Sequence, residues 1–112
     1  MKETITAWVI EPGREPEQRE IRNELEEFQR LVGGYIEPIF PYEEMEDDGK
    51  DVVMFCNEEG KLNGLEPNFS YHGDMIVGTV VIVGTEGEDI TDCPLNEDEL
   101  KAMLPWIWAW ED

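Results

Sequence analysis

The sequence offers few side chains that could carry out catalysis. His72 is the only histidine, and Cys56 and Cys93 are the only cysteines. One histidine and two distant cysteines cannot supply the three or four ligands of a zinc site without help from Asp or Glu. Glu58 and Glu59 follow Cys56 closely, and their charge opposes formation of a nucleophilic thiolate. Phosphate-binding glycine motifs and the serine-hydrolase elbow are also missing, so we expect a protein that is not an enzyme and uses no cofactor.

A run of acidic residues at 43–49 invites a calcium interpretation, because carboxylate oxygens are the ligands that Ca²⁺ prefers. Aligning the glycine of this run with the sixth position of an EF-hand loop puts Phe55 at position twelve. That position requires a bidentate Glu. We therefore expect no metal site and interpret residues 41–51 as an acidic loop that contacts a basic surface.

Carboxylates dominate the charge of the whole chain. The sequence has 28 Asp and Glu against 8 Lys and Arg, a net charge of −20 and an isoelectric point near 4.1. After Lys61 the only basic residue is Lys101. Binding to nucleic acid depends on basic side chains that neutralise phosphates, so we expect no direct nucleic-acid binding. The expected partner is instead a basic protein surface.

The spacing of some carboxylates indicates what that partner could be. Residues i and i+2 of an extended chain lie roughly 6.8 Å apart, close to the phosphate spacing along one DNA strand. Glu15 and Glu17 have this sequence spacing, and so do Glu86 and Glu88. We interpret the acidic surface as a DNA mimic that occupies the phosphate-binding channel of a nucleic-acid-binding enzyme and inhibits it. The alternative is an adaptor or regulator that binds a host protein, with acidity serving solubility.

The residues expected to bind the partner are acidic side chains from the loop and from later turns. They are Glu43, Glu44, Glu46, Asp47, Asp48, Asp51, Glu58, Glu59, Glu86, Glu88 and Asp89. A third interpretation is a small-ligand site. It would use Asn57, Asn68, Tyr71 and His72.

Three tryptophans stand at alternate positions near the C-terminal end. Trp106, Trp108 and Trp110 follow Pro105, and each can bury about 200 Å² of largely apolar surface. They either cover the core of their own domain or form a contact surface, since Trp is common at binding hot spots. We expect self-association through these residues, with a homodimer as the result.

Periodicity and turn residues predict an α+β protein in which a mixed sheet of four to five strands is covered by one main helix, 23–32. We expect that helix to start at the N-cap Asn23 and to end at Gly33, and a C-terminal helix to follow Asn96. Strands are expected at 4–10, 17–22, 35–40, 51–56 and 74–84, with a return strand starting at Lys61 and an irregular stretch at 63–73.

The length of 112 residues predicts one domain, 1–112, with the acidic loop at 41–51 and a Trp-rich tail at 105–112. No apolar run approaches the roughly 20 residues of a membrane-spanning helix, and the first residues do not read as a secretory signal. We therefore expect a cytoplasmic protein, without a membrane partner and with reduced, structural cysteines.

Four strings of the sequence resemble one known family. They are 9–13 (VIEPG), 31–37 (LVGGYIE), 56–62 with 64–68 (CNEEGKL and GLEPN), and 73–79 ending in 82–84 (GDMIVGT and IVG). The resemblance is to a small family of domains of unknown function, encoded by bacteriophages and conjugative elements of Gram-positive bacteria, with some members beside antirestriction genes. The resemblance implies a mobile-element protein that acts in the cytoplasm of a bacterial host, but it supplies no assigned chemistry. For such a protein we expect the DNA mimic to inhibit a host nucleic-acid-binding defence enzyme of the restriction or CRISPR type. The acidic loop and the Trp-rich tail depart from the family pattern.

Overall fold

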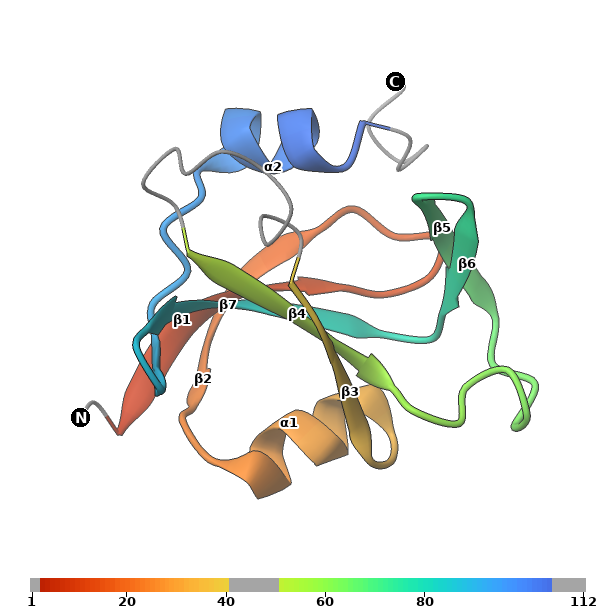
Figure 1. Ribbon diagram of the computed structural model, residues 1–112, viewed down its shortest axis with the longest axis horizontal. Coiled ribbons are helices and arrows are strands. Elements are labelled where there is room, and N and C mark those ends of the chain that lie inside the picture. Colours follow the sequence, from red (N-terminus) through yellow and green to blue (C-terminus); the bar gives the residue numbers. More distant parts are fainter. Residues whose placement is uncertain (1–2, 41–50, 106–112) are drawn as a thin grey trace.

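The computed structural model describes residues 3–40 and 51–105 of the chain (Figure 1). The strands and helices follow one another along the chain as β1 (Thr4–Ile10), β2 (Glu17–Arg22), α1 (Leu25–Val32), β3 (Ile36–Ile39), β4 (Val52–Asn57), β5 (Pro67–Tyr71), β6 (Asp74–Val77), β7 (Val80–Glu86), β8 (Asp89–Thr91) and α2 (Glu97–Met103).

The main sheet has six strands in the order β2-β1-β7-β4-β3, and β8 pairs with the second half of β7. All strand pairs of the described residues are antiparallel. The α+β class is confirmed, but the expectation of a mixed sheet with four to five strands is wrong. The hairpins β1–β2 and β7–β8 pair antiparallel because their connections are too short for a crossover, whereas β1–β7 and β4–β7 join strands far apart in the chain, whose relative direction no local signal indicates.

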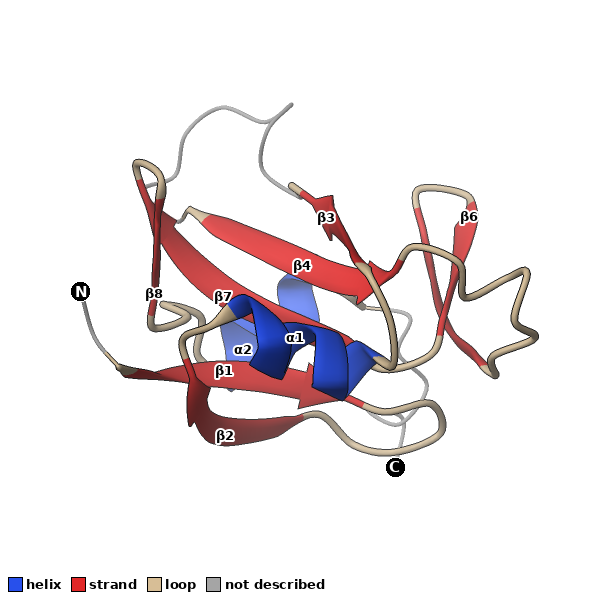
Figure 2. Ribbon diagram, turned by 90° about the horizontal axis from the view of Figure 1, so that it is seen from below, coloured by secondary structure: helices blue, strands red, loops and turns tan. Residues whose placement is uncertain are grey.

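Layers cover both faces of this sheet, and the view in Figure 2 shows α1 in front and α2 behind. On the α1 side, Phe28 and Val32 pack against sheet residues such as Val81. On the other side, Leu100 of α2 and Phe69 of β5 share a core with Trp8 and other sheet residues. The strongly apolar β4 is buried at all its positions because it lies inside the sheet, between β7 and β3, and both of its faces are covered. The β5–β6 hairpin, which covers part of this second face, was not predicted from the sequence.

Both predicted helices exist, with one corrected boundary. The N-cap of α1 is Glu24 and not Asn23, because the Asn23 side chain donates a hydrogen bond to the Ile90 carbonyl at 3.0 Å. Gly33 ends the helix in the left-handed conformation with φ 83°, as expected. Asn96 caps α2, also as expected, and the structure adds a capping box in which the Glu99 side chain accepts from the Asn96 N–H.

The predicted strand at 74–84 is two strands that belong to different sheets. The chain breaks at Gly78, whose φ is 76°, so β6 pairs with β5 while β7 enters the main sheet. Buried Asn68 holds the small β5–β6 hairpin to the main sheet, since its side chain donates to the carbonyls of Ile10 at 2.9 Å and Gly78 at 2.8 Å. The return strand expected at Lys61 is instead a turn, and β5 lies within the stretch that was expected to be irregular.

The cysteines are as expected: Cys56 and Cys93 are buried and not disulfide-bonded. None of the helices in the described residues is long and apolar enough to cross a membrane.

Candidate functional site

The structure divides the predicted partner-binding residues between two places. Asp51, Glu86, Glu88 and Asp89 lie together where β4 and the β7–β8 hairpin end, and we call these four the acidic end. Glu58 and Glu59 lie in the turn after β4, beside a pocket at the opposite end of that strand. The remaining candidates lie outside the described residues. They are Glu43, Glu44, Glu46, Asp47, Asp48 and the three tail tryptophans Trp106, Trp108 and Trp110.

The acidic end is built on a tight hairpin. Gly87, with φ 62°, and Glu88 form the two-residue connection between β7 and β8. A glycine at the first position of such a turn suits a type II′ hairpin, whose twist matches that of the strands. The Thr85 N–H donates to the Asp51 carbonyl at 3.0 Å, which brings the start of β4 beside the hairpin. Backbone geometry alone therefore places these carboxylates next to one another.

Two of these carboxylates stand directly opposite each other. Glu86 and Asp89 are cross-strand partners in the β7–β8 ladder, and both are exposed. Opposed side chains in an antiparallel pair lie about 5 Å apart, and like charges there are destabilising. The repulsion between Glu86 and Asp89 thus lowers the stability of the hairpin that carries them.

The cations of the described residues are engaged elsewhere. Each Lys and Arg that the structure describes lies within 4.0 Å of a carboxylate, and none of those carboxylates belongs to the acidic end. Arg19, for example, pairs with Glu17 at 2.6 Å and with Glu11 at 3.5 Å. Among the residues that the structure describes, no cation therefore balances the acidic end.

The expected phosphate-like spacing is not formed by Glu86 and Glu88. Glu86 is the last residue of β7 and Glu88 lies in the turn, so the two are not on one extended strand. The pairing with Arg19 also neutralises Glu17, a member of the other predicted pair. The negative charge of the acidic end comes instead from residues that meet across the hairpin.

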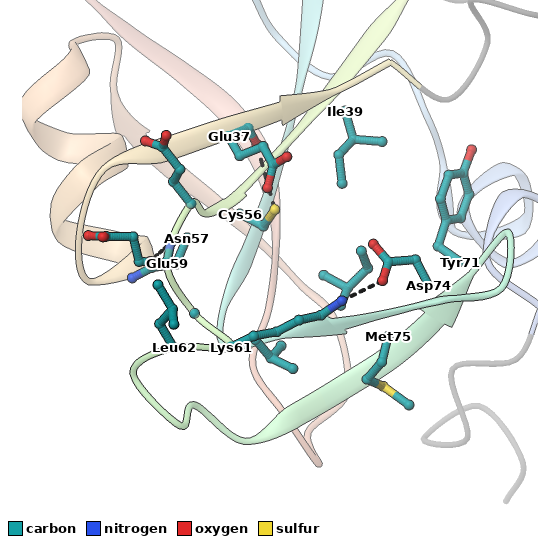
Figure 3. Close-up of a pocket in the computed structure, with 14 residues that line it drawn as sticks. Glu37, Ile39, Cys56, Asn57, Glu59, Lys61, Leu62, Tyr71, Asp74 and Met75 are labelled. Carbon is teal, nitrogen blue, oxygen red and sulfur yellow. Dashed lines mark hydrogen bonds and ion pairs between the residues drawn. The ribbon is translucent and has the colours of Figure 1, made fainter.

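The second place is a pocket of about 420 Å³ between the β3–β4 edge and the β5–β6 hairpin (Figure 3). Acidic, basic, apolar and aromatic side chains line it. They are Glu37, Ile39, Cys56, Asn57, Glu58, Glu59, Lys61, Leu62, Tyr71, Asp74, Met75, Ile76 and Val77, with Gly60.

Asn57 fixes the shape of this pocket from behind. Its amide donates to the Val32 carbonyl at 3.1 Å, and its side-chain oxygen accepts from the Glu59 N–H at 2.8 Å. The contact needs a glycine at 34, where an added Cβ would lie 2.9 Å from the Asn57 amide nitrogen. Asn57 is thus a structural residue that joins the end of α1 to the turn carrying Glu58 and Glu59.

The thiol of Cys56 faces the pocket but is poorly suited to nucleophilic attack. Burial, followed by the charges of Glu37 and Asp74, raises its pKa from 9.0 to about 11, although Lys61 acts in the opposite direction. The thiol donates to the Glu37 carbonyl at 3.6 Å. It is protonated at neutral pH and contributes a small apolar surface to the floor of the pocket.

The small-ligand site expected from Asn57, Asn68, Tyr71 and His72 does not form as one cluster. Asn57 and Tyr71 line the pocket, whereas Asn68 holds the hairpin to the main sheet. His72 sits in the β5–β6 turn with φ 49°, its ring edge-on to Tyr71 at 4.3 Å between centroids.

Sequence reasoning missed two acidic residues of the pocket, Glu37 and Asp74. They come from different sheets, and no periodic pattern places an edge strand beside a hairpin. Within the described ranges, no group of three or more His, Cys, Asp or Glu side chains is arranged to hold a metal ion.

Comparison with known proteins gives one match. A family model described as Domain of unknown function (DUF3846) matches residues 5–104. No curated protein and no solved structure matches.

The strings that carry the family resemblance have structural roles in this fold. Gly33 and Gly34 end α1 against Asn57, and an added Cβ at Gly60 would lie 2.7 Å from Val77. Asn68 bonds the carbonyl of Gly78. These residues of the four strings thus connect elements of the fold, and none of the acidic-end residues lies in the strings.

Proposed function

This chain belongs to the DUF3846 family of domains of unknown function, and we propose that it inhibits a nucleic-acid-binding defence enzyme by DNA mimicry. The target is a host nuclease of the restriction or CRISPR type, and the chain is the product of a mobile genetic element, in keeping with the resemblance of its sequence to phage and conjugative-element proteins. The acidic end makes the contact, together with the acidic side chains at 43–48 within the acidic loop. No catalytic step and no cofactor is involved.

The observation that carries the proposal is the cross-strand pair Glu86 and Asp89. Both are exposed, they face each other across a ladder, and neither takes part in an ion pair of the described residues. Like charges so placed lower the stability of the hairpin. An arrangement that costs stability and is open to solvent is typical of a functional surface.

Charge complementarity supplies the binding mechanism. The phosphate channel of a nuclease presents Arg and Lys side chains that normally hold a DNA backbone. Carboxylates at the acidic end accept hydrogen bonds from the same donors, and the charge of −20 accelerates the encounter with a positive channel. The inhibitor and DNA then exclude each other from the channel.

The test uses a panel of purified restriction endonucleases and CRISPR effector nucleases, with cleavage of a fluorescent DNA duplex as the readout. Added protein should inhibit at least one enzyme, and excess DNA should relieve the inhibition. The affinity should fall by at least about tenfold between roughly 50 and 300 mM NaCl, because salt screens the contact.

Matched variants locate the contact. The triple substitution Glu86→Gln, Glu88→Gln and Asp89→Asn should weaken inhibition by about tenfold or more. A control with the same change in charge is Glu15→Gln, Glu26→Gln and Glu66→Gln, three exposed positions away from the acidic end. Equal losses in both variants would point to a diffuse field. Inhibition that is insensitive to salt, or a ternary complex that still contains DNA, would reject mimicry and favour the adaptor alternative.

A further inference from the structure

The pocket beside Cys56 has two contrasting linings. Its inner wall contains the nearly buried side chains of Cys56 and Ile76, which are 5% and 6% exposed, with Ile39 and Val77 beside them. Figure 3 shows Ile39 and Cys56 on one side of the hollow and Tyr71 on the other. An aliphatic or aromatic surface of this kind favours the carbon body of a ligand.

Apolar side chains also stand at the rim of the pocket. Leu62 is 85% exposed and Met75 is 43% exposed, and both line the opening. These two are among the few large hydrophobic side chains that the described surface leaves exposed. Their position at a cavity mouth provides apolar surface that a ligand entering the pocket would cover.

The charged lining is mostly negative. Glu37 from β3 and Asp74 from β6 approach the hollow from opposite walls, and Glu58 and Glu59 stand on the adjoining turn. Lys61 is the one cation in the lining, and its ammonium group pairs with Asp74 at 2.5 Å. Several carboxylates would repel an entering anion. They would attract an entering cation, which only Lys61 would repel.

We propose that this pocket binds an organic cation, with the ammonium or guanidinium group between Glu37 and Asp74 and the alkyl chain against Ile39 and Ile76. The volume of about 420 Å³ falls within the range of small-ligand sites. This proposal does not rest on DNA mimicry, because the pocket and the acidic end lie at opposite ends of β4. The cation is either a free amine or guanidine, or the Lys or Arg side chain of a bound protein.

Lys61 gives this proposal a distinctive consequence. Its side chain crosses the mouth from the turn to Asp74, and both partners of the pair are exposed at 63% and 64% (Figure 3). An exposed pair of this kind contributes little to stability. The incoming cation must displace Lys61 from Asp74, so Lys61 acts as a competitor held within the chain.

The direct test is a titration of the full chain, labelled with nitrogen-15, with butylguanidinium and with its neutral isostere butylurea. Butylguanidinium should shift the backbone amide signals of residues 57–62 and 71–77, while butylurea should bind at least about tenfold more weakly, because only the cation makes charge-assisted hydrogen bonds. Equal binding of both compounds, or shifts spread evenly over the surface, would overturn the proposal.

Variants then separate a pocket site from general attraction to an acidic protein. Asp74→Asn should weaken binding by about tenfold. Lys61→Gln should tighten binding severalfold by freeing Asp74 from its internal partner. The control Glu66→Gln changes the charge by the same amount as Asp74→Asn at an exposed position outside this pocket, and it should have little effect. A Lys61→Gln variant that binds no better, or a Glu66→Gln variant that loses as much as Asp74→Asn, would contradict the proposed site.

Two further probes assign the source of the cation. Agmatine represents a free ligand, and acetyl-arginine-methylamide represents an arginine side chain within a protein. Binding of acetyl-arginine-methylamide with an affinity similar to that of agmatine would assign the pocket to a protein partner. Binding of agmatine alone would assign it to a free amine. Failure of both probes would overturn the proposal, and it would leave the nuclease inhibition assay unaffected.

Discussion

Asn57 shows how a polar side chain in a motif can be structural. Its buried amide bridges the Val32 carbonyl and the Glu59 N–H, and the close approach of Gly34 depends on it. Satisfied buried hydrogen bonds specify a local geometry because leaving either group without a partner is expensive. In the sequence, Asn57 stands between Cys56 and Glu58 and suggests a ligand site. In the structure, its side chain instead attaches a turn to the end of a helix.

Cys56 provides a pH-dependent prediction at the residue scale. Its pKa is raised from 9.0 to about 11 in the folded chain, so the folded state binds the thiol proton more tightly than the unfolded state. This contribution to stability is complete below pH 9 and is lost as the pH rises toward 11. The loss amounts to about 2 to 3 kcal/mol of the free energy of unfolding. Urea denaturation of the wild type at pH 8 and pH 10.5 measures most of this loss, which is complete only above pH 11.

The matching control for this prediction is Cys56→Ala. Tyr and Lys side chains also titrate in this range, but they do so in both proteins, so the difference between the two pH profiles isolates the thiol. The wild type should lose more stability than the variant between the two pH values. Parallel profiles would show that the folded thiol ionises at its ordinary pKa.

At the scale of elements, local sequence signals predicted the parts that depend on local contacts. They include the apolar run of β4, the left-handed glycine at 33 and the N-cap Asn96. The β5–β6 hairpin was not predicted, because its only strongly apolar inward positions, Phe69 and Ile76, are separated by turn residues. Its attachment depends on Asn68, whose partners are distant in the sequence or lie across a turn.

The candidate sites were predictable to a similar degree. Acidic residues at 58, 59, 86, 88 and 89 could be identified from the sequence, but their separation into two places follows from strand order and register. Asn23 is instructive because a good N-cap residue was used to bond Ile90, which shifted the helix start by one position. Tertiary contacts of this kind override local preference, and periodicity carries no information about them.

The β7–β8 hairpin gives a prediction in which stability and function change in opposite directions. Asp89→Lys would turn the like-charged pair with Glu86 into an oppositely charged pair. The free energy of unfolding should rise by a few tenths to about 1 kcal/mol, the usual range for cross-strand pairs. Inhibition of the target nuclease should weaken at the same time. Urea midpoints and the cleavage assay, performed on the same preparation, measure both effects.

A neutral comparison sharpens that test. Asp89→Asn removes the repulsion without adding attraction, so its stability should fall between those of the wild type and Asp89→Lys. A Lys variant that is less stable than the wild type would show that the two side chains point apart. A stabilised variant with full inhibition would place the contact away from the hairpin.

At the scale of the whole molecule, the described basic side chains are not distributed evenly among the acidic ones. The described cations pair with carboxylates around β2, α1, the pocket and α2, and none of them pairs with the acidic end. A net charge of −20 keeps copies of the chain apart at low ionic strength. Any contact between two copies must therefore bury enough apolar surface to exceed this repulsion.

We expect the Trp-rich tail to supply the apolar surface for such a contact. Trp106, Trp108 and Trp110 lie outside the described residues, so self-association through them stays a prediction from the sequence. Each side chain can bury about 200 Å², and soluble monomers rarely leave so large an apolar patch open. A second copy can cover it through a two-fold interface in which the same patch meets itself.

Salt should then act on self-association and on target binding in opposite directions. Screening weakens the repulsion between two chains of −20 while apolar burial persists, so dimerisation should strengthen as NaCl rises from roughly 50 to 500 mM. Light scattering of the full chain and of a truncation after Leu104 measures this, and the truncation retains the buried Leu100 and Leu104 of the α2 region. The full chain should dimerise and the truncation should remain monomeric with a similar urea midpoint. A full chain that stays monomeric in high salt would exclude the interface, and a truncation that loses much of its stability would show that the tryptophans cover the core of their own domain.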